Sequence, residues 1–297
     1  MKRIVSCCSP TLTLVSFTRS LTEGFSMVAM IPLNDGHTIP QLGLGVWQMK
    51  DQEAYDAVSY ALSIGYRHID TAALYHNEEA VGRAIADSGL DRDEIFVTTK
   101  LWNDRHDDAP AALTESLSKL GLEFVDLYLI HWPAPKYNQF TVAWDALIAE
   151  RDAGRARSIG VSNFTVEDLM TLREHSDVVP AVNQIELHPS LAQNELRALH
   201  EKLGIVTEAW SPLGQAKELD NPIVQEIAAS TTLTPAQVVL AWHLHHGIVC
   251  IPKSVTPSRI EENFATAGIR LTKSDIDRLD TLDAGNRIGP DPTTTEF

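Results

Sequence analysis

The feature that most constrains the fold is a regular alternation of short apolar strands and helices that begins at Leu42. The strands are continuous in their apolar residues rather than alternating. Continuous runs are typical of strands buried on both faces, as in a parallel sheet. Eight strands are predicted, at 42–47, 67–70, 94–100, 124–131, 156–163, 182–186, 205–210 and 248–251. Predicted helices between and after them include 51–64, 109–120, 140–153 and 166–175, and amphipathic helices at 194–203, 235–246 and 257–267.

Eight such units in roughly 250 residues is the count of an α/β fold, the (β/α)8 TIM barrel. We therefore predict one domain over residues 27–297, with a hairpin at 31–39 that closes the bottom of the barrel. The alternative is a Rossmann sheet, which carries a G-x-G-x-x-G turn after its first strand. Gly43 and Gly45 begin that pattern, but Gln48 stands where the third glycine is needed.

Residues 1–26 do not continue this pattern. Lys2 and Arg3 precede a mildly apolar stretch similar to a signal peptide, but polar residues interrupt it and no cleavage site follows. A disordered extension, or a start assigned too early, is favoured over a targeting segment.

Charge and cysteine content exclude several kinds of partner. The net charge is −16; residues 1–26 contribute +2, so the remainder carries −18 and repels nucleic acid and anionic membranes. There is no apolar run long enough to span a membrane. Cys7 and Cys8 are adjacent and Cys250 is isolated, which fits neither a disulfide framework nor a metal site. We expect a reduced, cytoplasmic protein without a metal.

Polar side chains end three consecutive strands of the predicted barrel. Asp70, Lys100 and His131 follow one another at intervals of about one strand–helix unit, and Tyr75 comes shortly after Asp70. The carboxyl ends of barrel strands meet at one mouth, where active sites lie. These four side chains are therefore expected to be neighbours. Asn77 is expected to cap the helix that follows.

The four residue types suit proton donation to an oxygen that gains negative charge. A free phenol is a poor acid at neutral pH, and a nearby ammonium group favours its ionised form. Lys100 is thus expected to lower the pKa of Tyr75, Asp70 to hold Lys100, and His131 to orient a carbonyl oxygen. Such a site lacks only a hydride donor, which a cofactor supplies.

Each residue also has a structural alternative. Asp70 and Lys100 can form an ion pair that only stabilises the barrel, and His131 can be a hydrogen-bonded core residue. Three tryptophans near the same strand ends, Trp47, Trp102 and Trp132, can serve packing alone. Their convergence on one face favours a site.

At this point the motifs resemble the aldo-keto reductases. They are Ile69-Asp70-Thr71-Ala72 with Tyr75, Thr98-Thr99-Lys100-Leu101-Trp102, Asp126 to Pro133, Ile159 to Phe164, and Ile251-Pro252-Lys253-Ser254, all in family order. The resemblance covers residues 31–283. It implies a monomeric barrel that binds NADPH and reduces an aldehyde or ketone, with a catalytic tetrad of Asp70, Tyr75, Lys100 and His131 in which Tyr75 is the general acid.

The resemblance also implies the cofactor site. Ser162, Asn163 and Gln184 would bind the nicotinamide carboxamide, Trp210 would stack on the ring, and Ser211 and Leu213 would contact the pyrophosphate. The adenosine end would be held by Lys253, Ser254, Val255, Thr256, Arg259, Glu262 and Asn263.

The distribution of charge independently supports the predicted site for the adenosine end of the cofactor. Lys253 and Arg259 stand beside two hydroxyls before a predicted helix in a chain that is otherwise acidic. Two cations at a helix start suit a phosphate, which favours NADPH over NADH. The alternative is a solvated basic patch.

Two features differ from many family members. Trp210 replaces the usual tyrosine, a pattern closer to bacterial diketogluconate reductases. The tail after Asp283 is short, which predicts an open pocket walled by Trp47, Trp102 and Trp132 for a small carbonyl substrate. The alternative function is a nicotinamide-binding regulatory module with little turnover.

Overall fold

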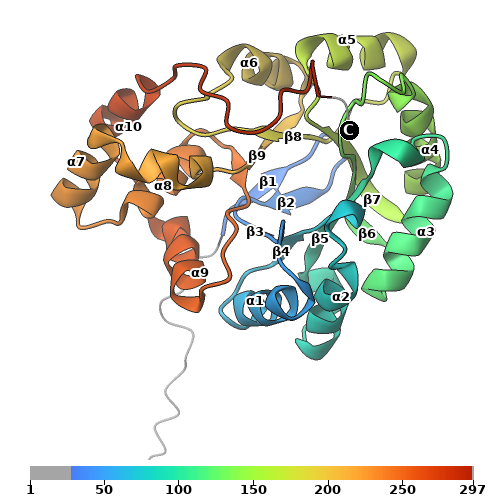
Figure 1. Ribbon diagram of the computed structural model, residues 1–297, viewed down its shortest axis with the longest axis horizontal. Helices are drawn as coiled ribbons and strands as arrows, with labels where there is room; N and C mark the ends of the chain where they lie inside the picture. The colour runs from blue at the N-terminus through green and yellow to red at the C-terminus, as the bar shows by residue number, and fades with distance from the viewer. Residues whose placement is uncertain (1–27, 296–297) are drawn as a thin grey trace, which may run out of the picture.

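The structure, a computed structural model, describes residues 28–295, and its centre is a parallel sheet of eight strands (Figure 1). Neighbouring strands follow one another along the chain, and a parallel bridge between Leu42 and Cys250 joins the first strand to the last. The sheet is thereby closed, and the predicted TIM barrel is confirmed. The strands are β3 (Leu44–Gly45), β4 (His68–Asp70), β5 (Phe96–Leu101), β6 (Val125–Ile130), β7 (Ala156–Ser162), β8 (Val182–Glu186), β9 (Val206–Trp210) and β10 (Val249–Cys250).

The first and last strands are shorter than predicted. At their seam the backbone N–H of Gly43 donates to Cys250 O and that of Gly45 to Pro252 O, at 2.9 and 3.4 Å. Pro252 has no N–H to return a bond, so the ladder ends there.

Helices surround the barrel, as Figure 1 shows. They are α1 (Asp51–Ser63), α2 (Glu78–Asp87), α3 (Ala109–Leu120), α4 (Phe140–Asp152), α5 (Val166–His175), α6 (Asn194–Leu203), α7 (Pro222–Thr231), α8 (Pro235–His245), α9 (Pro257–Phe264) and α10 (Lys273–Asp280). Short 3-10 turns are η1 (Ala73–Tyr75), η2 (Arg92–Glu94), η3 (Asn103–Arg105), η4 (Gly214–Asp220) and η5 (Ala265–Gly268). Helices α7 and α10 lie outside the predicted set.

The prediction that 235–246 is an amphipathic helix was wrong. In α8 the buried residues run without a break from Val238 to His243, so no polar face remains there. The reason is that α7, α9 and η5 pack on α8, in addition to the barrel strand β10. A helix covered on several sides has no solvent face to keep polar.

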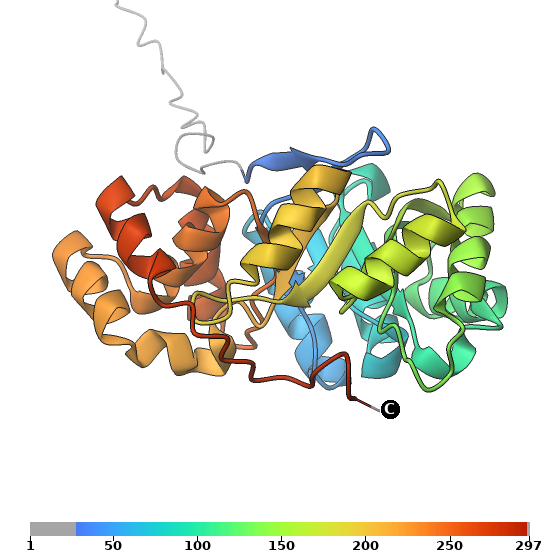
Figure 2. The same ribbon diagram turned by 90° about the horizontal axis from the view of Figure 1, so that it is seen from above.

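The predicted N-terminal hairpin closes the bottom of the barrel. Strands β1 (Met30–Pro32) and β2 (Thr38–Pro40) pair antiparallel around a turn in which Gly36 has φ +91°. Ile39 is fully buried in a cluster with side chains from the starts of the barrel strands, among them Phe96 and Val182. Figure 2 shows the hairpin on one side of the barrel and the C-terminal tail on the opposite side.

That tail crosses the mouth of the barrel after α10 (Figure 1). The backbone N–H groups of Ile288 and Gly289 donate to the carboxylate of Glu186, at the end of β8, at 2.7 and 2.9 Å. The N–H groups of Ala284 and Asn286 both donate to Ser190 O. The tail is therefore bonded to the loop that follows β8.

Two findings concern the described part of the chain as a whole. Within residues 28–295 no helix combines the length and the apolar character needed to cross a membrane. In the same range Cys250 is a buried free thiol. The interpretation of residues 1–26, with Cys7 and Cys8, lies outside the described residues.

Candidate active site

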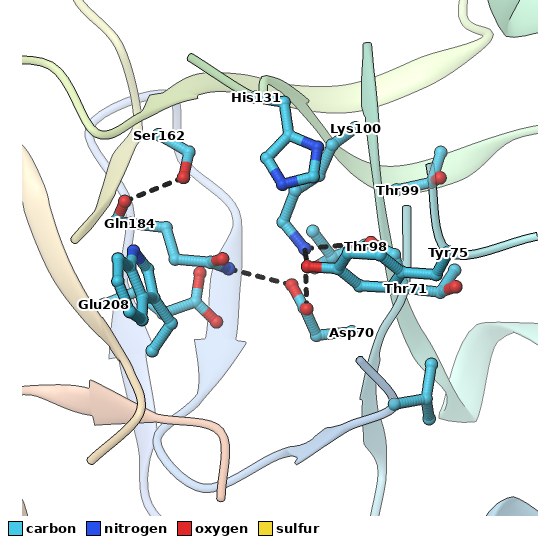
Figure 3. A network of polar contacts seen from close by, with 12 residues as sticks. Asp70, Thr71, Tyr75, Thr98, Thr99, Lys100, His131, Ser162, Gln184 and Glu208 are labelled. Carbon is cyan, nitrogen blue, oxygen red and sulfur yellow. Dashed lines mark hydrogen bonds and ion pairs between the residues drawn. The ribbon is translucent and has the colours of Figure 1, made fainter. Parts of the chain in front are cut away.

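Four side chains that the sequence predicts to be neighbours meet at the barrel mouth (Figure 3). Asp70 ends β4, Lys100 lies near the end of β5, His131 follows β6, and Tyr75 lies in η1. The parallel registers place Asp70 beside Thr98 and Lys100 beside Leu129, which brings consecutive strand ends to the same level. The strand–helix repeat thus builds the cluster.

Lys100 is the centre of the cluster and is fully buried. Its Nζ donates to Asp70 Oδ1 at 2.6 Å, to Thr71 O at 2.9 Å and to the Tyr75 hydroxyl at 3.5 Å. Burial acts to lower the pKa of this ammonium group, but the charge and hydrogen bond of Asp70, together with Tyr75 and Glu208, outweigh burial, so the pKa lies above its usual value. Lys100 therefore stays cationic beside the phenol.

The pKa of Tyr75 lies above its usual value, although Lys100 acts to lower it as expected. Burial of the phenol raises the pKa more than the neighbouring Lys100 lowers it. The ammonium group lies 3.5 Å away, at the limit of a hydrogen bond, which limits its effect. Tyr75 is consequently protonated at neutral pH, the state in which it can donate a proton.

His131 faces Tyr75 across the cavity. The ring centroids are 5.7 Å apart and nearly perpendicular, and Trp102 lies 5.1 Å from His131 in the same edge-to-face manner. Burial, and then the charge of Lys100, hold the pKa of His131 well below its usual value. The imidazole is therefore neutral and offers one N–H donor.

Next to the tetrad lies a network of amides that ends at Trp210. Gln184 Nε2 donates to Asp70 Oδ2, and Trp210 Nε1 donates to Asn163 Oδ1, both at 2.8 Å. Asn163 Nδ2 in turn donates to His131 O and to Ser162 Oγ. The structure thus brings all four predicted nicotinamide residues together with the tetrad. Asn163 has φ +63°, a strained conformation of the kind that clusters at functional sites.

A cavity of about 310 Å³ opens above these residues. Trp47, Trp102 and Trp132 line it as predicted, and Trp47 is 45 % exposed at its rim. Gly289 and Pro290 of the tail line it as well, so the predicted open pocket is wrong on that side. The short tail still reaches the mouth because Glu186 binds its backbone.

The predicted adenosine end lies at the start of α9. Lys253, Val255, Thr256 and Arg259 are exposed there, while Ser254 is buried and its Oγ accepts the N–H of Thr256 at 3.1 Å. Within residues 28–295 neither Lys253 nor Arg259 forms an ion pair with a carboxylate. Asn263 is buried, and Glu262 accepts a hydrogen bond from Thr234. Ser211, with φ +48°, and Leu213 follow β9, and Ser211 lines the cavity.

The Asn77 prediction was wrong in its detail. Asn77 precedes α2, but its side chain does not cap the helix. Its Nδ2 donates to Val46 O and Met49 O, and its Oδ1 accepts from Thr71. The hydrogen bonds of the Asn77 side chain hold the loop after β3 against the loop after β4, and this positions Tyr75.

Comparison with known proteins decides the family. The aldo/keto reductase family model matches residues 41–284. The chain belongs to this family. This aldo-keto reductase is 53 % identical over 273 residues to an aldo-keto reductase of Mycolicibacterium smegmatis, covering 91 % of this chain and 99 % of the relative. It is 48 % identical over 265 residues to methylglyoxal reductase DkgA of Escherichia coli, covering 89 % and 96 %.

Solved structures agree with the fold and bear on the cofactor. The structure of a Gox0644 mutant in complex with NADPH has a TM-score of 0.87 and 45 % identity, over 91 % of this chain and 99 % of that one. A Bombyx mori aldo-keto reductase in complex with NADP has a TM-score of 0.83 and 37 % identity, over 88 % and 94 %. This aldo-keto reductase is an NADPH-dependent oxidoreductase that reduces carbonyl groups.

The residues of this reductase fit such a cofactor. His131 Nδ1 is buried without a hydrogen-bond partner among the described residues, and the indole of Trp210 is part of the cavity wall. At the far end, Lys253 and Arg259, which pair with no carboxylate among residues 28–295, lie near the hydroxyls of Ser254 and Thr256 in the chain, which suits phosphate groups.

Sequence reasoning missed three parts of this reductase site. Glu186 ends β8 as a polar residue, but its role in binding the tail needs the path of the tail. Gly289 and Pro290 carry no sequence signal. Glu208, fully buried inside β9, had one: a carboxylate inside an otherwise apolar strand.

Proposed function

We propose that this reductase acts on small aldehydes and α-dicarbonyl compounds such as methylglyoxal, with Tyr75 as the proton donor. The observation that carries the proposal is the Tyr75 hydroxyl next to the buried Lys100–Asp70 pair, at the floor of a cavity of about 310 Å³. Relatives with about half of their residues identical include DkgA of Escherichia coli, which is named a methylglyoxal reductase.

Each residue of the tetrad has a distinct role in this proposal. NADPH supplies the hydride. Tyr75 gives its proton to the carbonyl oxygen, and Lys100 stabilises the phenolate that remains. Asp70 holds Lys100 through the 2.6 Å ion pair. The neutral imidazole of His131 donates a hydrogen bond to the carbonyl oxygen and so fixes its direction.

The proposed cofactor roles are those that the family resemblance implies, and the geometry supports the nicotinamide end. Ser162, Asn163 and Gln184 would bind the carboxamide, because their polar atoms lie beside Trp210 and the tetrad. Ser211 and Leu213 would contact the pyrophosphate. The remaining residues, Lys253, Ser254, Val255, Thr256, Arg259, Glu262 and Asn263, would hold the adenosine end.

The three tryptophans explain the preference for small substrates. Trp47, Trp102 and Trp132 leave an apolar cavity, which is closed on one side by Pro290. A bulky ketone would have to displace the tail from Glu186. Small carbonyl compounds fit without this cost.

Replacement of Tyr75 by Phe tests the mechanism. Without the hydroxyl, kcat for methylglyoxal reduction should fall about 10²- to 10⁴-fold, the usual contribution of a general acid. The dissociation constant of NADPH, measured by its fluorescence, should change little. Tyr55→Phe is a matched control, because that hydroxyl bonds Asp87 on the outer helices.

Full activity of Tyr75→Phe contradicts the proposed role of Tyr75. If the wild-type protein binds NADPH tightly but reduces none of a panel of aldehydes, dicarbonyls and ketones, the nicotinamide-binding regulatory module is favoured instead.

We also propose a cytoplasmic, monomeric protein whose residues 27–297 form one domain. The buried free thiol of Cys250 suits a reducing compartment. Six large apolar side chains are exposed among the described residues, among them Met30 on β1, Val142 on α4 and Met170 on α5. Light scattering after size exclusion would reveal any dimer.

A further inference from the structure

A carboxylic side chain lies inside the barrel, directly beside the catalytic tetrad. Glu208 is in the middle of β9 and is fully buried. Among the described residues neither of its carboxyl oxygens has a hydrogen-bond partner. A buried ionised carboxylate without a partner is very costly, so this group needs an explanation.

Titratable side chains from three other strands surround Glu208. His68 and Asp70 come from β4, Lys100 from β5 and the Cys250 thiol from β10. Gln184 on β8 is its register partner, and the Tyr75 phenol of η1 lies within its electrostatic reach. Figure 3 shows Glu208 beside Gln184, on the Asp70 side of the cluster. Two carboxyl groups thus share the field of one ammonium group.

The His68 contacts locate a proton. His68 Nδ1 lies 3.3 Å from Pro40 O, which can only accept, so Nδ1 carries the hydrogen of the neutral ring. His68 Nε2 then has a lone pair, and this nitrogen lies 3.3 Å from the Thr98 hydroxyl and 3.6 Å from Glu208 Oε1. The negative charge of an ionised Glu208 would be repelled by that lone pair and by the Asp70 carboxylate. A proton on Glu208 removes both repulsions.

The titration of the two groups agrees with this placement. Burial, and then the charge of Asp70, raise the pKa of Glu208 to about 8, against the smaller lowering effects of the Gln184 side chain and of Lys100. Burial lowers the pKa of His68 to about 3, so the ring does not take the proton instead.

We propose that Glu208 is a positioning residue of the reduction: it remains a neutral acid beneath the tetrad, so that Asp70 is the single carboxylate that balances Lys100. The proposal rests on the proposed role of Tyr75. When Tyr75 gives up its proton, the resulting phenolate depends on Lys100 for stabilisation. A negative charge on Glu208 would destabilise the Tyr75 phenolate and so make Tyr75 a weaker acid.

The consequence is a pH effect of defined sign. Glu208 ionises as the pH rises through its raised pKa, and this raises the pKa of Tyr75 and slows reduction. Glu208→Gln keeps the shape of the neutral acid at all pH values. The ratio of kcat in Glu208→Gln to kcat in the wild type should therefore rise about fivefold or more between about pH 7 and pH 9.

The experiment compares kcat for NADPH-dependent methylglyoxal reduction across this pH range in the full-length protein. Glu150→Gln is the control, because Glu150 is also a buried carboxyl group, on α4, and pairs with Arg155 away from the barrel mouth. Its ratio to the wild type should be independent of pH. A flat or falling ratio for Glu208→Gln overturns the proposal.

Infrared difference spectra provide a readout that does not depend on activity or on Tyr75. The wild-type protein with NADPH at neutral pH should show a protonated carboxyl band that is absent from Glu208→Gln and that titrates at alkaline pH. Absence of this band overturns the proposal, whatever the activity of Tyr75→Phe.

Discussion

Gly289 is the position where a single methyl group should open the active site. A Cβ on this residue would lie 2.3 Å from Trp210 Cη2 and 3.0 Å from Glu186 Oε2. Ordinary contacts begin near 3.4 Å, so the tail must retreat by roughly one ångström. Its backbone φ does not require glycine, so the clash is the main effect of Gly289→Ala.

The cost follows from the bonds that the retreat breaks. The Gly289 N–H donates to the Glu186 carboxylate at 2.9 Å, and lengthening this bond by roughly one ångström removes it. A hydrogen bond to a charged group is worth about 1.5–3 kcal/mol. This corresponds to an increase of about 10- to 150-fold in the ratio of open to closed tail.

Two assays follow the tail. For Gly289→Ala we expect KM for methylglyoxal to rise about tenfold, because the cavity loses one wall, and bulky ketones to become better substrates. Limited proteolysis should cleave after α10 faster than in the wild type. The control is the double variant with Trp210→Tyr, since a smaller ring removes the clashing atoms and should restore the tail. Unchanged KM and proteolysis in Gly289→Ala, or no rescue relative to Trp210→Tyr alone, would refute this reasoning.

Two further predictions concern charge. Arg259→Ala should raise the dissociation constant of NADPH about tenfold or more but leave that of NADH nearly unchanged, since only NADPH offers the 2′-phosphate. Arg83→Ala, which removes an exposed ion pair, is the control. An equal loss of affinity for both cofactors would contradict the assignment. His188 lies between the carboxylates of Glu186 and Glu218, at 3.1 and 2.8 Å, and these carboxylates raise its pKa although burial acts to lower it. This stabilisation is complete below the unfolded pKa of about 6.5 and is lost as the pH rises through the raised folded value. The Tm of the wild type should therefore fall over that window, and the Tm of His188→Gln should not; parallel Tm curves would count against it.

The fold was predictable because burial on both faces leaves a direct mark on the sequence. The continuous apolar runs predicted all eight strands. The regular interval from Asp70 to Lys100 to His131 predicted that these three residues are neighbours. Cys250 falls within the predicted strand 248–251 and lies in β10 of the structure.

The features that could not be predicted depend on opposing effects on a pKa and on the path of the backbone. The pKa direction of Tyr75 results from burial against the charge of Lys100, and a sequence shows the charge but not the burial. The tail carries no periodic pattern, and its bonds to Glu186 come from backbone N–H groups that every residue except proline has. Asn77 had the residue type of a helix cap, but two backbone carbonyls compete for its side chain.

The seam between the first and last strands has a consequence for synthesis on the ribosome. Gln41 Nε2 donates to Ile248 O, 207 positions later in the chain, and Cys250 N donates back to Gln41 O. At about 5–20 residues per second, the first strand waits roughly 10 to 40 seconds for its partner. Throughout that interval the nascent sheet has an open apolar edge. Barrel closure, and with it the mouth that holds Asp70 and Lys100, belongs to the last moments of translation.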